Sequence, residues 1–280
     1  MDLQTKHEKL LYPVVRVNSV DPKGNKAAGS GTVIYSEPDP ENSGKYFNFV
    51  LTNHHVIDSL ILLKSTWDSV LKKERKKEFF TRPEVEIFDY VDQSTIDSSN
   101  SGSADIVAYS VEHDLALLKL TTARKLRYVA PLLPEDKIKD LRLFMPIAVS
   151  GCSMAHQPFV NLGELTFLTE DIENHMYFMY NAGSYFGNSG GALFLADTGE
   201  LIGVPSRITT LPMGFSMDMV TFMGFGAHTS RLYAFIRHEH MNFLIDSTKT
   251  WKNAVEDREK AEKRSVLQMQ IEATRELEKK

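Results

Sequence analysis

One stretch is more informative than any other in the 280 residues of this chain: Gly187-Asn188-Ser189-Gly190-Gly191. The glycines around Ser189 predict a tight turn that leaves the serine accessible and brings backbone N–H groups close to it. A serine hydroxyl attacks a carbonyl only when an adjacent base removes its proton, and the resulting oxyanion needs N–H donors. The turn therefore predicts a nucleophile, provided that the chain also supplies a base and a carboxylate.

Two stretches upstream supply this base and this carboxylate, and they read Thr52-Asn53-His54-His55-Val56 and His113-Asp114-Leu115-Ala116-Leu117-Leu118. Imidazole titrates near neutral pH and can take the serine proton, and a carboxylate can fix the imidazole tautomer. The two histidines of the first stretch are adjacent and point to different sides, so one of them serves as the base. The three stretches together predict a protease-type site.

In their order along the chain, the three stretches resemble those of the chymotrypsin-like serine proteases, and most of all those of the HtrA/Deg type. That family carries Thr-Asn-x-His-Val, Asp-Leu/Ile-Ala-Leu and Gly-Asn-Ser-Gly-Gly-Ala-Leu in the same order. The resemblance covers roughly residues 10 to 237 and extends to further strand-like segments, which are Gly29–Ile34, Glu200–Val204 and Gly224–Ala227.

The resemblance implies a role for each catalytic residue. Ser189 is expected to be the nucleophile, His55 the general base and then acid, and Asp114 the orienting carboxylate. The oxyanion hole is expected at Gly187, Asn188 and Ser189, with the amides of Gly187 and Ser189 as donors. The resemblance implies neither a cofactor nor a metal ion.

The resemblance also places the substrate-binding residues, which are Gly183, Ser184, Ser206 and Arg207. Gly183 and Ser184 are expected near the base of the main specificity pocket, where no Asp or Glu occurs. A preference for Lys or Arg at the P1 position, just before the scissile bond, is therefore not expected. A small to medium apolar P1 residue is expected instead, in a peptide or protein substrate.

Short β-rich runs separated by turn residues predict an all-β fold. The resemblance implies two antiparallel six-stranded β-barrels with the site between them. A trypsin-like protease domain is expected over residues 1–246, with an insert at 65–103. Within this insert we expect a basic surface helix over 65–80 and a polar loop over 94–103.

The last segment, residues 247–280, contains no Gly or Pro and interleaves charges of both signs. This composition predicts one long C-terminal α-helix, with Ser247 or Thr248 as its N-cap. The helix is expected either to pack across the barrels or to join a homo-oligomer or larger assembly.

Composition limits the partners and the compartment. The formal net charge of -5 gives no reason to expect nucleic-acid binding. The polar N-terminus lacks the apolar run of a signal peptide, and the apolar stretches are shorter than the roughly 20 residues of a membrane span. Cys152 is the one cysteine, so no intramolecular disulfide forms, and we expect it to be a buried packing residue. No membrane partner and a cytoplasmic location are therefore expected.

The sequence is also compatible with two other functions. The chain could be a protease-like scaffold or assembly protein whose site is silent or self-limited. It could also be an esterase of the α/β-hydrolase type, because Gly187-x-Ser189-x-Gly191 fits the nucleophile elbow of that fold. That fold places its acid and histidine after the serine and alternates helices with parallel strands, which agrees poorly with this β-rich chain.

Overall fold

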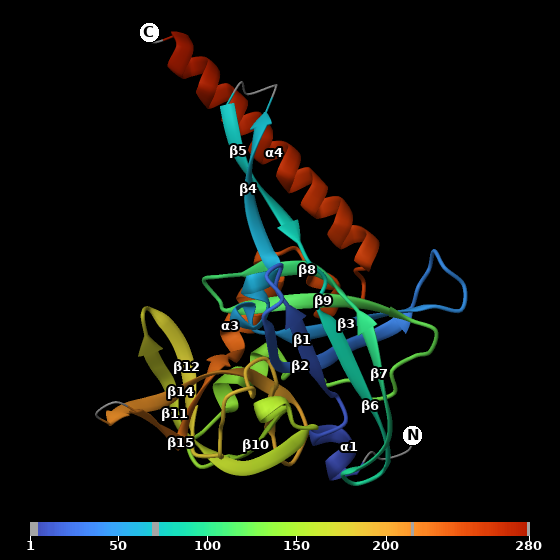
Figure 1. The fold of residues 1–280 in the computed structure, drawn as a ribbon, viewed down its shortest axis with the longest axis vertical. Coiled ribbons are helices and arrows are strands. Elements are labelled where there is room, and N and C mark those ends of the chain that lie inside the picture. Colours follow the sequence, from blue (N-terminus) through green and yellow to red (C-terminus); the bar gives the residue numbers. More distant parts are fainter. Residues whose placement is uncertain (1–4, 69–72, 214–215, 279–280) are drawn as a thin grey trace. The chain divides into compact units, whose positions relative to one another are not determined.

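The computed structural model describes residues 5–68, 73–213 and 216–278 of the chain (Figure 1). The chain divides into two compact units. The first comprises Met1–Leu60 with Thr81–Phe235, and the second comprises Ile61–Phe80 with Ile236–Lys280. Strands dominate the first unit, and a long helix ends the chain in the second. The expected all-β fold class with a C-terminal helix is confirmed.

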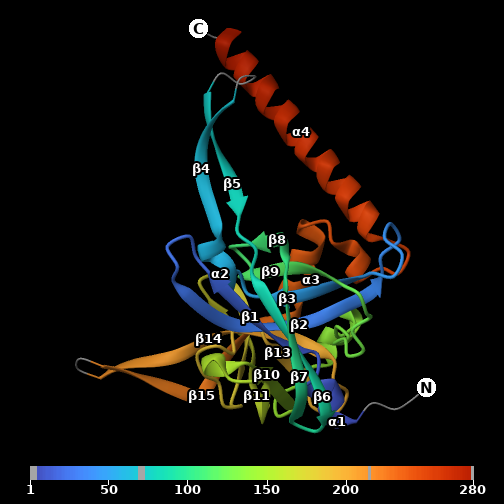
Figure 2. The same cartoon turned by 45° about the vertical axis from the view of Figure 1, so that its right-hand side comes forward.

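A closed, six-stranded antiparallel barrel forms the later half of the first unit, in the order β10-β11-β12-β15-β14-β13. Its interior holds apolar side chains such as Val149, Phe178 and Leu193, which are at most 1% exposed. β14 and β15 continue together past the other strands as a hairpin (Figure 2). The barrel strands are β10 (Pro146–Gly151), β11 (Phe159–Ile172), β12 (His175–Tyr180), β13 (Ala192–Leu195), β14 (Leu201–Met213) and β15 (Ser216–His228).

The earlier half of the first unit is a seven-stranded antiparallel sheet, in the order β7-β6-β1-β2-β3-β9-β8. Its end strands are not paired with each other in the described residues, so it differs from the six-stranded barrel that the resemblance implied. β9 lies between β3 and β8, and its nearly continuous apolar run is accordingly buried. The strands are β1 (Val14–Val20), β2 (Lys26–Pro38), β3 (Tyr46–Thr52), β6 (Glu84–Asp92), β7 (Thr95–Ser103), β8 (Asp105–Ser110) and β9 (Leu115–Thr122).

Helices in the first unit are short. The α-helices are α1 (Lys6–Leu10), α2 (His54–Ile57) and α3 (Thr229–His238), which continues past the boundary at Phe235. The 3₁₀ turns are η1 (Asp58–Leu60), η2 (Glu135–Asp140) and η3 (Ser153–Ala155). No helix in the described residues is both long enough and apolar enough to cross a membrane.

The second unit contains a two-stranded hairpin of β4 (Ile61–Asp68) and β5 (Lys73–Phe80), followed in sequence by η4 (Asn242–Leu244) and α4 (Trp251–Glu278). The basic helix expected over 65–80 is therefore wrong. Lysine and glutamate favour a helix in isolation, but this preference is small beside tertiary pairing, and eight successive cross-strand pairs, from Ile61↔Phe80 to Asp68↔Lys73, make this segment a β-ribbon. Residues 69–72 lie outside the described residues.

The polar loop expected over 94–103 is also wrong, because Thr95–Ser103 forms strand β7. β7 pairs with β6 at the end of the sheet, and most of its side chains are exposed. Backbone hydrogen bonds to one neighbour hold an edge strand of this kind. Since neither of its faces is buried, its serine-rich sequence has no apolar alternation from which a strand could be predicted.

The C-terminal helix begins later than Ser247 or Thr248. Thr250 precedes the first helical residue, and Asn253 N–H donates to Thr250 Oγ1 at 3.3 Å. In return, Thr250 N–H donates to Asn253 Oδ1 at 2.9 Å. This reciprocal pair closes the helix start, which is the capping arrangement expected of a threonine N-cap. Thr248 N–H instead donates to the Asp246 carboxylate ahead of the helix.

Acid is expected to destabilise the fold through His228, which ends β15 and is 6% exposed. Burial, together with the nearby charge of Arg231, lowers the pKa of His228 from 6.5 to about 4. At a pH between these two pKa values, His228 binds a proton in the unfolded chain but not in the folded chain. The free energy of unfolding therefore falls as the pH falls through this range. The loss from pH 7 to pH 5 is about 2 kcal/mol.

Urea unfolding of the wild type and of His228→Gln at pH 7 and at pH 5 measures this loss. The variant removes the titrating group, so its free energy of unfolding is expected to change with pH by about 2 kcal/mol less than that of the wild type. Equal pH dependence in the two proteins would contradict the assignment.

Candidate active site

His55 lies in the first turn of α2, immediately after β3. Asn53 precedes the helix, and its Nδ2 group donates to the backbone carbonyl of Asp114 at 2.7 Å. Thr52 Oγ1 donates to the carbonyl of Ser30 at 2.7 Å. These two bonds fix the end of β3 and therefore the place where α2 begins. The neighbouring His54 stacks on Tyr109 at a ring distance of 5.3 Å, so His55 is the histidine that meets Asp114.

Asp114 lies in the turn between β8 and β9, with a φ of 50° that few non-glycine residues adopt. Its carboxylate accepts hydrogen bonds from His55 Nδ1 at 2.9 and 3.0 Å, and from the His55 backbone N–H at 3.1 Å. Ser206 Oγ donates to Asp114 Oδ2 at 2.5 Å. Burial acts to raise the pKa of Asp114, but these hydrogen bonds outweigh burial and lower the pKa below its usual value. An ionised Asp114 holds the proton on His55 Nδ1 and leaves Nε2 as an acceptor.

The turn around Ser189 is held in place by Ser30, a residue whose role the sequence did not reveal. Ser30 N–H donates to the carbonyl of Ser189 at 2.9 Å, and Ser30 Oγ donates to the carbonyl of Gly187 at 2.6 Å. Ser30 Oγ also accepts from the N–H of Cys152 at 2.7 Å. Cys152 itself is buried, and burial raises the pKa of its thiol to about 12. Ser30 thus connects the turn around Ser189 to strand β2.

Two backbone N–H groups of the turn are available to a ligand. In the described residues, the N–H groups of Gly187 and Ser189 donate to no protein acceptor. The N–H of Asn188 instead donates to the carbonyl of Tyr185 at 3.1 Å. Of the three residues expected to form an oxyanion hole, Asn188 therefore contributes no free amide. Its side chain is 3% exposed and accepts a hydrogen bond from Ser153.

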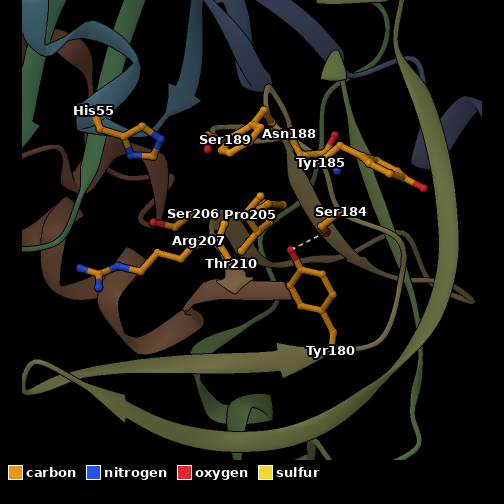
Figure 3. A pocket seen from close by; sticks show the side chains of 12 residues that line it. His55, Tyr180, Ser184, Tyr185, Asn188, Ser189, Pro205, Ser206, Arg207 and Thr210 are labelled. Carbon is orange, nitrogen blue, oxygen red and sulfur yellow. Dashed lines mark hydrogen bonds between the residues drawn. The ribbon is translucent and has the colours of Figure 1, made fainter. Parts of the chain in front are cut away.

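A pocket of about 370 Å³ brings these groups together (Figure 3). At one end, Ser184 Oγ donates to the buried hydroxyl of Tyr180 at 3.1 Å, and burial raises the pKa of Tyr180 to about 12. Gly183 does not line the pocket, and its carbonyl accepts from Asn161 Nδ2 at 2.8 Å. The pocket is lined by His55, Tyr180, Ser184, Tyr185, Phe186, Asn188, Ser189, Pro205, Ser206, Arg207, Ile208 and Thr210.

His55 and Ser189 both line the pocket, and no hydrogen bond joins their side chains among the described residues. A base and a nucleophile on one pocket wall can act together once a reacting group lies between the oxyanion donors and the hydroxyl. Within the described part of the chain, no three His, Cys, Asp or Glu side chains cluster in a way that could hold a metal ion. The chemistry that the geometry offers is nucleophilic attack by a hydroxyl, assisted by an imidazole.

Gly190→Ala is expected to lower the free energy of unfolding by about 2–5 kcal/mol, because it combines backbone strain with a steric clash. Gly190 has a φ of +83°, and an added Cβ would lie 2.2 Å from both the Ser30 carbonyl oxygen and Thr52 Oγ1. Gly24 provides a matched control, since its φ is +87° but no atom lies within 4 Å of an added Cβ. Gly24→Ala therefore costs only the strain, about 1–2 kcal/mol. Urea unfolding compares the two variants, and equal losses would show that the close approach at Gly190 is unimportant.

Comparison with known proteins gives one family match. A family model described as the trypsin-like peptidase domain matches residues 29–204. This segment contains His55, Asp114 and Ser189, and it makes up more than half of the chain. A search of curated proteins finds no match to the chain.

Solved structures of similar fold include two of the HtrA-type protease AlgW with tripeptide, one of them a variant of that protein. The variant gives a TM-score of 0.57 at 16% sequence identity, covering 84% of this chain and 63% of that chain. The other structure gives a TM-score of 0.57 at 18% identity, covering 88% of this chain and 65% of that chain. This chain spans less than two thirds of the length of those chains, and at these identities the likeness shows the fold.

Proposed function

The chain belongs to the trypsin-like peptidase family, and on this premise we propose that it is a serine endopeptidase that forms an acyl-enzyme on Ser189. One observation carries the proposal. His55 Nδ1 is bound to the Asp114 carboxylate at 2.9 Å, in a pocket that Ser189 also lines. This pairing prepares an imidazole whose second nitrogen is free to take a serine proton.

In the proposed mechanism, a peptide carbonyl enters the pocket and Ser189 Oγ attacks its carbon while His55 Nε2 takes the hydroxyl proton. The charge on the carbonyl oxygen is then stabilised by the N–H groups of Gly187 and Ser189, which have no intramolecular acceptor in the described residues. His55 returns the proton to the leaving amine, and the acyl-enzyme remains. A water molecule activated by His55 hydrolyses this ester and restores the Ser189 hydroxyl. Throughout, Asp114 stabilises the positive form of His55.

The residues that line the pocket support an apolar P1 residue of small to medium size. They include Pro205, Ile208 and Phe186, and none of the lining residues is an Asp or Glu that could pair with Lys or Arg. We therefore propose that the substrate is a peptide or protein cleaved after such a residue.

The α/β-hydrolase alternative does not fit, because the named strand pairs of the described chain are all antiparallel and only short helices accompany them in the first unit. The scaffold alternative stays open as a rival of the protease proposal. Two exposed features agree with an assembly role, namely Trp67 on the β4–β5 hairpin and Leu267 on α4. We propose that α4 is the assembly element of the chain. We also propose a reducing, cytoplasmic location, because Cys152 is the single cysteine of the sequence and is free.

Labelling with a fluorophosphonate probe tests the proposed function directly. Such a probe reacts with a serine that an adjacent base activates, so the native chain is expected to take up one probe molecule per chain. Mass spectrometry of the digested protein should place the probe on Ser189, and heat-denatured protein should stay unlabelled. Labelled protein should also hydrolyse no peptides. Failure of the native chain to react, with peptides left intact, would favour the scaffold.

A further inference from the structure

Arg207 is the one permanently charged residue among those that line the pocket. It follows Ser206 on β14, and its side chain is 40% exposed. Figure 3 shows Arg207 and His55 toward one end of the pocket, with Tyr180 and Ser184 toward the other. A cation in such a place can pair with an anion of the protein or with an anionic group of a ligand.

Within the protein, the anion that pairs with Arg207 is Glu173. Arg207 Nη2 donates to Glu173 Oε2 at 2.7 Å, and the Arg207 guanidinium also lies over the ring of Tyr177, 5.5 Å from its centroid. Glu173 lies in the turn between β11 and β12 with a φ of 57°, and its side chain is 71% exposed. Such exposed ion pairs contribute at most about a fivefold change in an equilibrium constant. The Tyr177 ring, which also lies 4.4 Å from the Arg231 guanidinium, is a second partner of Arg207. Because the Glu173 carboxylate is exposed, a competing anion can displace it.

In the described residues, β14 has no strand partner on one of its edges near Arg207, although the Gly190 N–H donates to the carbonyl of Pro205 at 3.1 Å. One edge of β14 pairs with β15 as far as Met213, whereas the other edge pairs with β13 only as far as Gly203. Consider a peptide whose scissile carbonyl lies at Ser189 and whose P1 side chain lies at the Ser184 end of the pocket. The residues before P1 would then lie along this edge of β14. At about 3.3 Å per residue, three preceding residues cover about 10 Å, within reach of a long arginine side chain.

We propose that Arg207 selects substrates with Glu or Asp among the three residues before P1, and that Glu173 occupies the place of this substrate carboxylate in the free enzyme. The inference rests on the proposed peptidase function. A planar guanidinium held over Tyr177 matches a carboxylate with two parallel hydrogen bonds, which a neutral amide cannot equal. The acidic residue adds to the apolar P1 preference and does not replace it.

Matched peptides test this selectivity. Each carries an apolar P1 residue and differs only in Glu or Gln at P2, P3 or P4, and kcat/KM is measured for each pair. At one position or more, the wild type is expected to prefer Glu by about tenfold, the size of a charge-assisted hydrogen bond. Arg207→Gln should bring this ratio to about one, and Arg207→Glu should favour Lys over Gln at the same position. Glu173→Gln removes the competing carboxylate and should raise the Glu preference by up to about fivefold.

Arg82→Gln is the control, because Arg82 makes a 2.7 Å ion pair with Asp105 and is not among the residues that line the pocket. This variant should keep the wild-type ratio. A ratio near one at all three positions in the wild type, or a ratio unchanged by Arg207→Gln, would overturn the inference.

Binding of the same peptides to full-length Ser189→Ala, measured by calorimetry, separates this inference from the proposed function. If the probe labels Ser189 but Glu and Gln peptides bind equally, the function stands and the selectivity is wrong. If nothing is hydrolysed or labelled but Glu peptides bind about tenfold more tightly through Arg207, the chain recognises acidic peptides without cleaving them. Equal binding with no labelling would overturn both proposals.

Discussion

Ser189→Ala is expected to lower kcat for peptide hydrolysis by about 10⁶-fold, since the side chains of a catalytic triad act as a unit. The substitution removes the oxygen that we propose forms the acyl-enzyme, and it leaves the Gly187 and Ser189 N–H groups in place. A residual acceleration of about 10³ over the uncatalysed reaction should therefore remain. Stopped assays with a fluorogenic peptide over many hours measure such slow turnover.

The fold of the Ser189→Ala variant should not change, because it is the backbone carbonyl of Ser189, and not its hydroxyl, that accepts the hydrogen bond from Ser30. Near-ultraviolet circular dichroism and the thermal midpoint test this. Ser99→Ala, on the exposed strand β7, is the control for replacing a serine elsewhere. Undiminished turnover in Ser189→Ala, or a probe that now labels a different serine in native protein, would show that the nucleophile is another residue.

The sequence predicted the parts of the fold that surround the three motifs, because there the local chemistry and the strand pattern agree. Leu115–Leu120 is apolar except for Lys119, and it lies in β9, which is an interior strand between β3 and β8. The glycines around Ser189 predicted a turn, and Gly187 and Gly190 do adopt positive φ values of 96° and 83°. The motifs also predicted that His55 would contact Asp114, and the two side chains are hydrogen-bonded although they are 59 positions apart in the sequence.

The sequence did not predict strands that depend on pairing alone. Lys73–Phe80 is rich in Lys and Glu, which favour a helix in isolation, but it pairs with Ile61–Asp68 along its full length. Thr95–Ser103 carries no apolar alternation, because most of its side chains face solvent at the sheet edge. In both segments the partner strand decides the conformation, and this partner cannot be read from local composition.

The residues that support the site could not be predicted from the sequence for a similar reason. Ser30 and Thr52 hold the turn around Ser189 and the end of β3 through hydrogen bonds to backbone carbonyls. Any acceptor in the chain could satisfy a serine or threonine hydroxyl, so its partner is unknown until the fold is known. The available signal was the placement of Ser30 between two glycines, Gly29 and Gly31, which indicates close backbone packing. The Arg207–Glu173 pair likewise forms only because the β11–β12 turn lies next to β14.

Asp114→Asn is expected to lower kcat by about 10⁴-fold while leaving the fold intact. Asp114 accepts hydrogen bonds from His55 Nδ1, from the His55 backbone N–H and from Ser206. An amide at this place can direct its own N–H group toward His55, so that Nδ1 becomes the acceptor and the proton moves to Nε2. In this tautomer, His55 cannot take the proton of Ser189 at neutral pH.

The same substitution separates a tautomer effect from a loss of structure, because asparagine nearly matches aspartate in size. Peptide KM is expected to change little while kcat falls, since Asp114 is not among the residues that line the pocket. Asp105→Asn, which removes an exposed carboxylate at the start of β8, is the matched control and should keep wild-type kcat. At high pH, where hydroxide can assist proton removal, the deficit of Asp114→Asn should shrink. A loss of less than about tenfold in a normally folded Asp114→Asn protein would mean that another group orients His55.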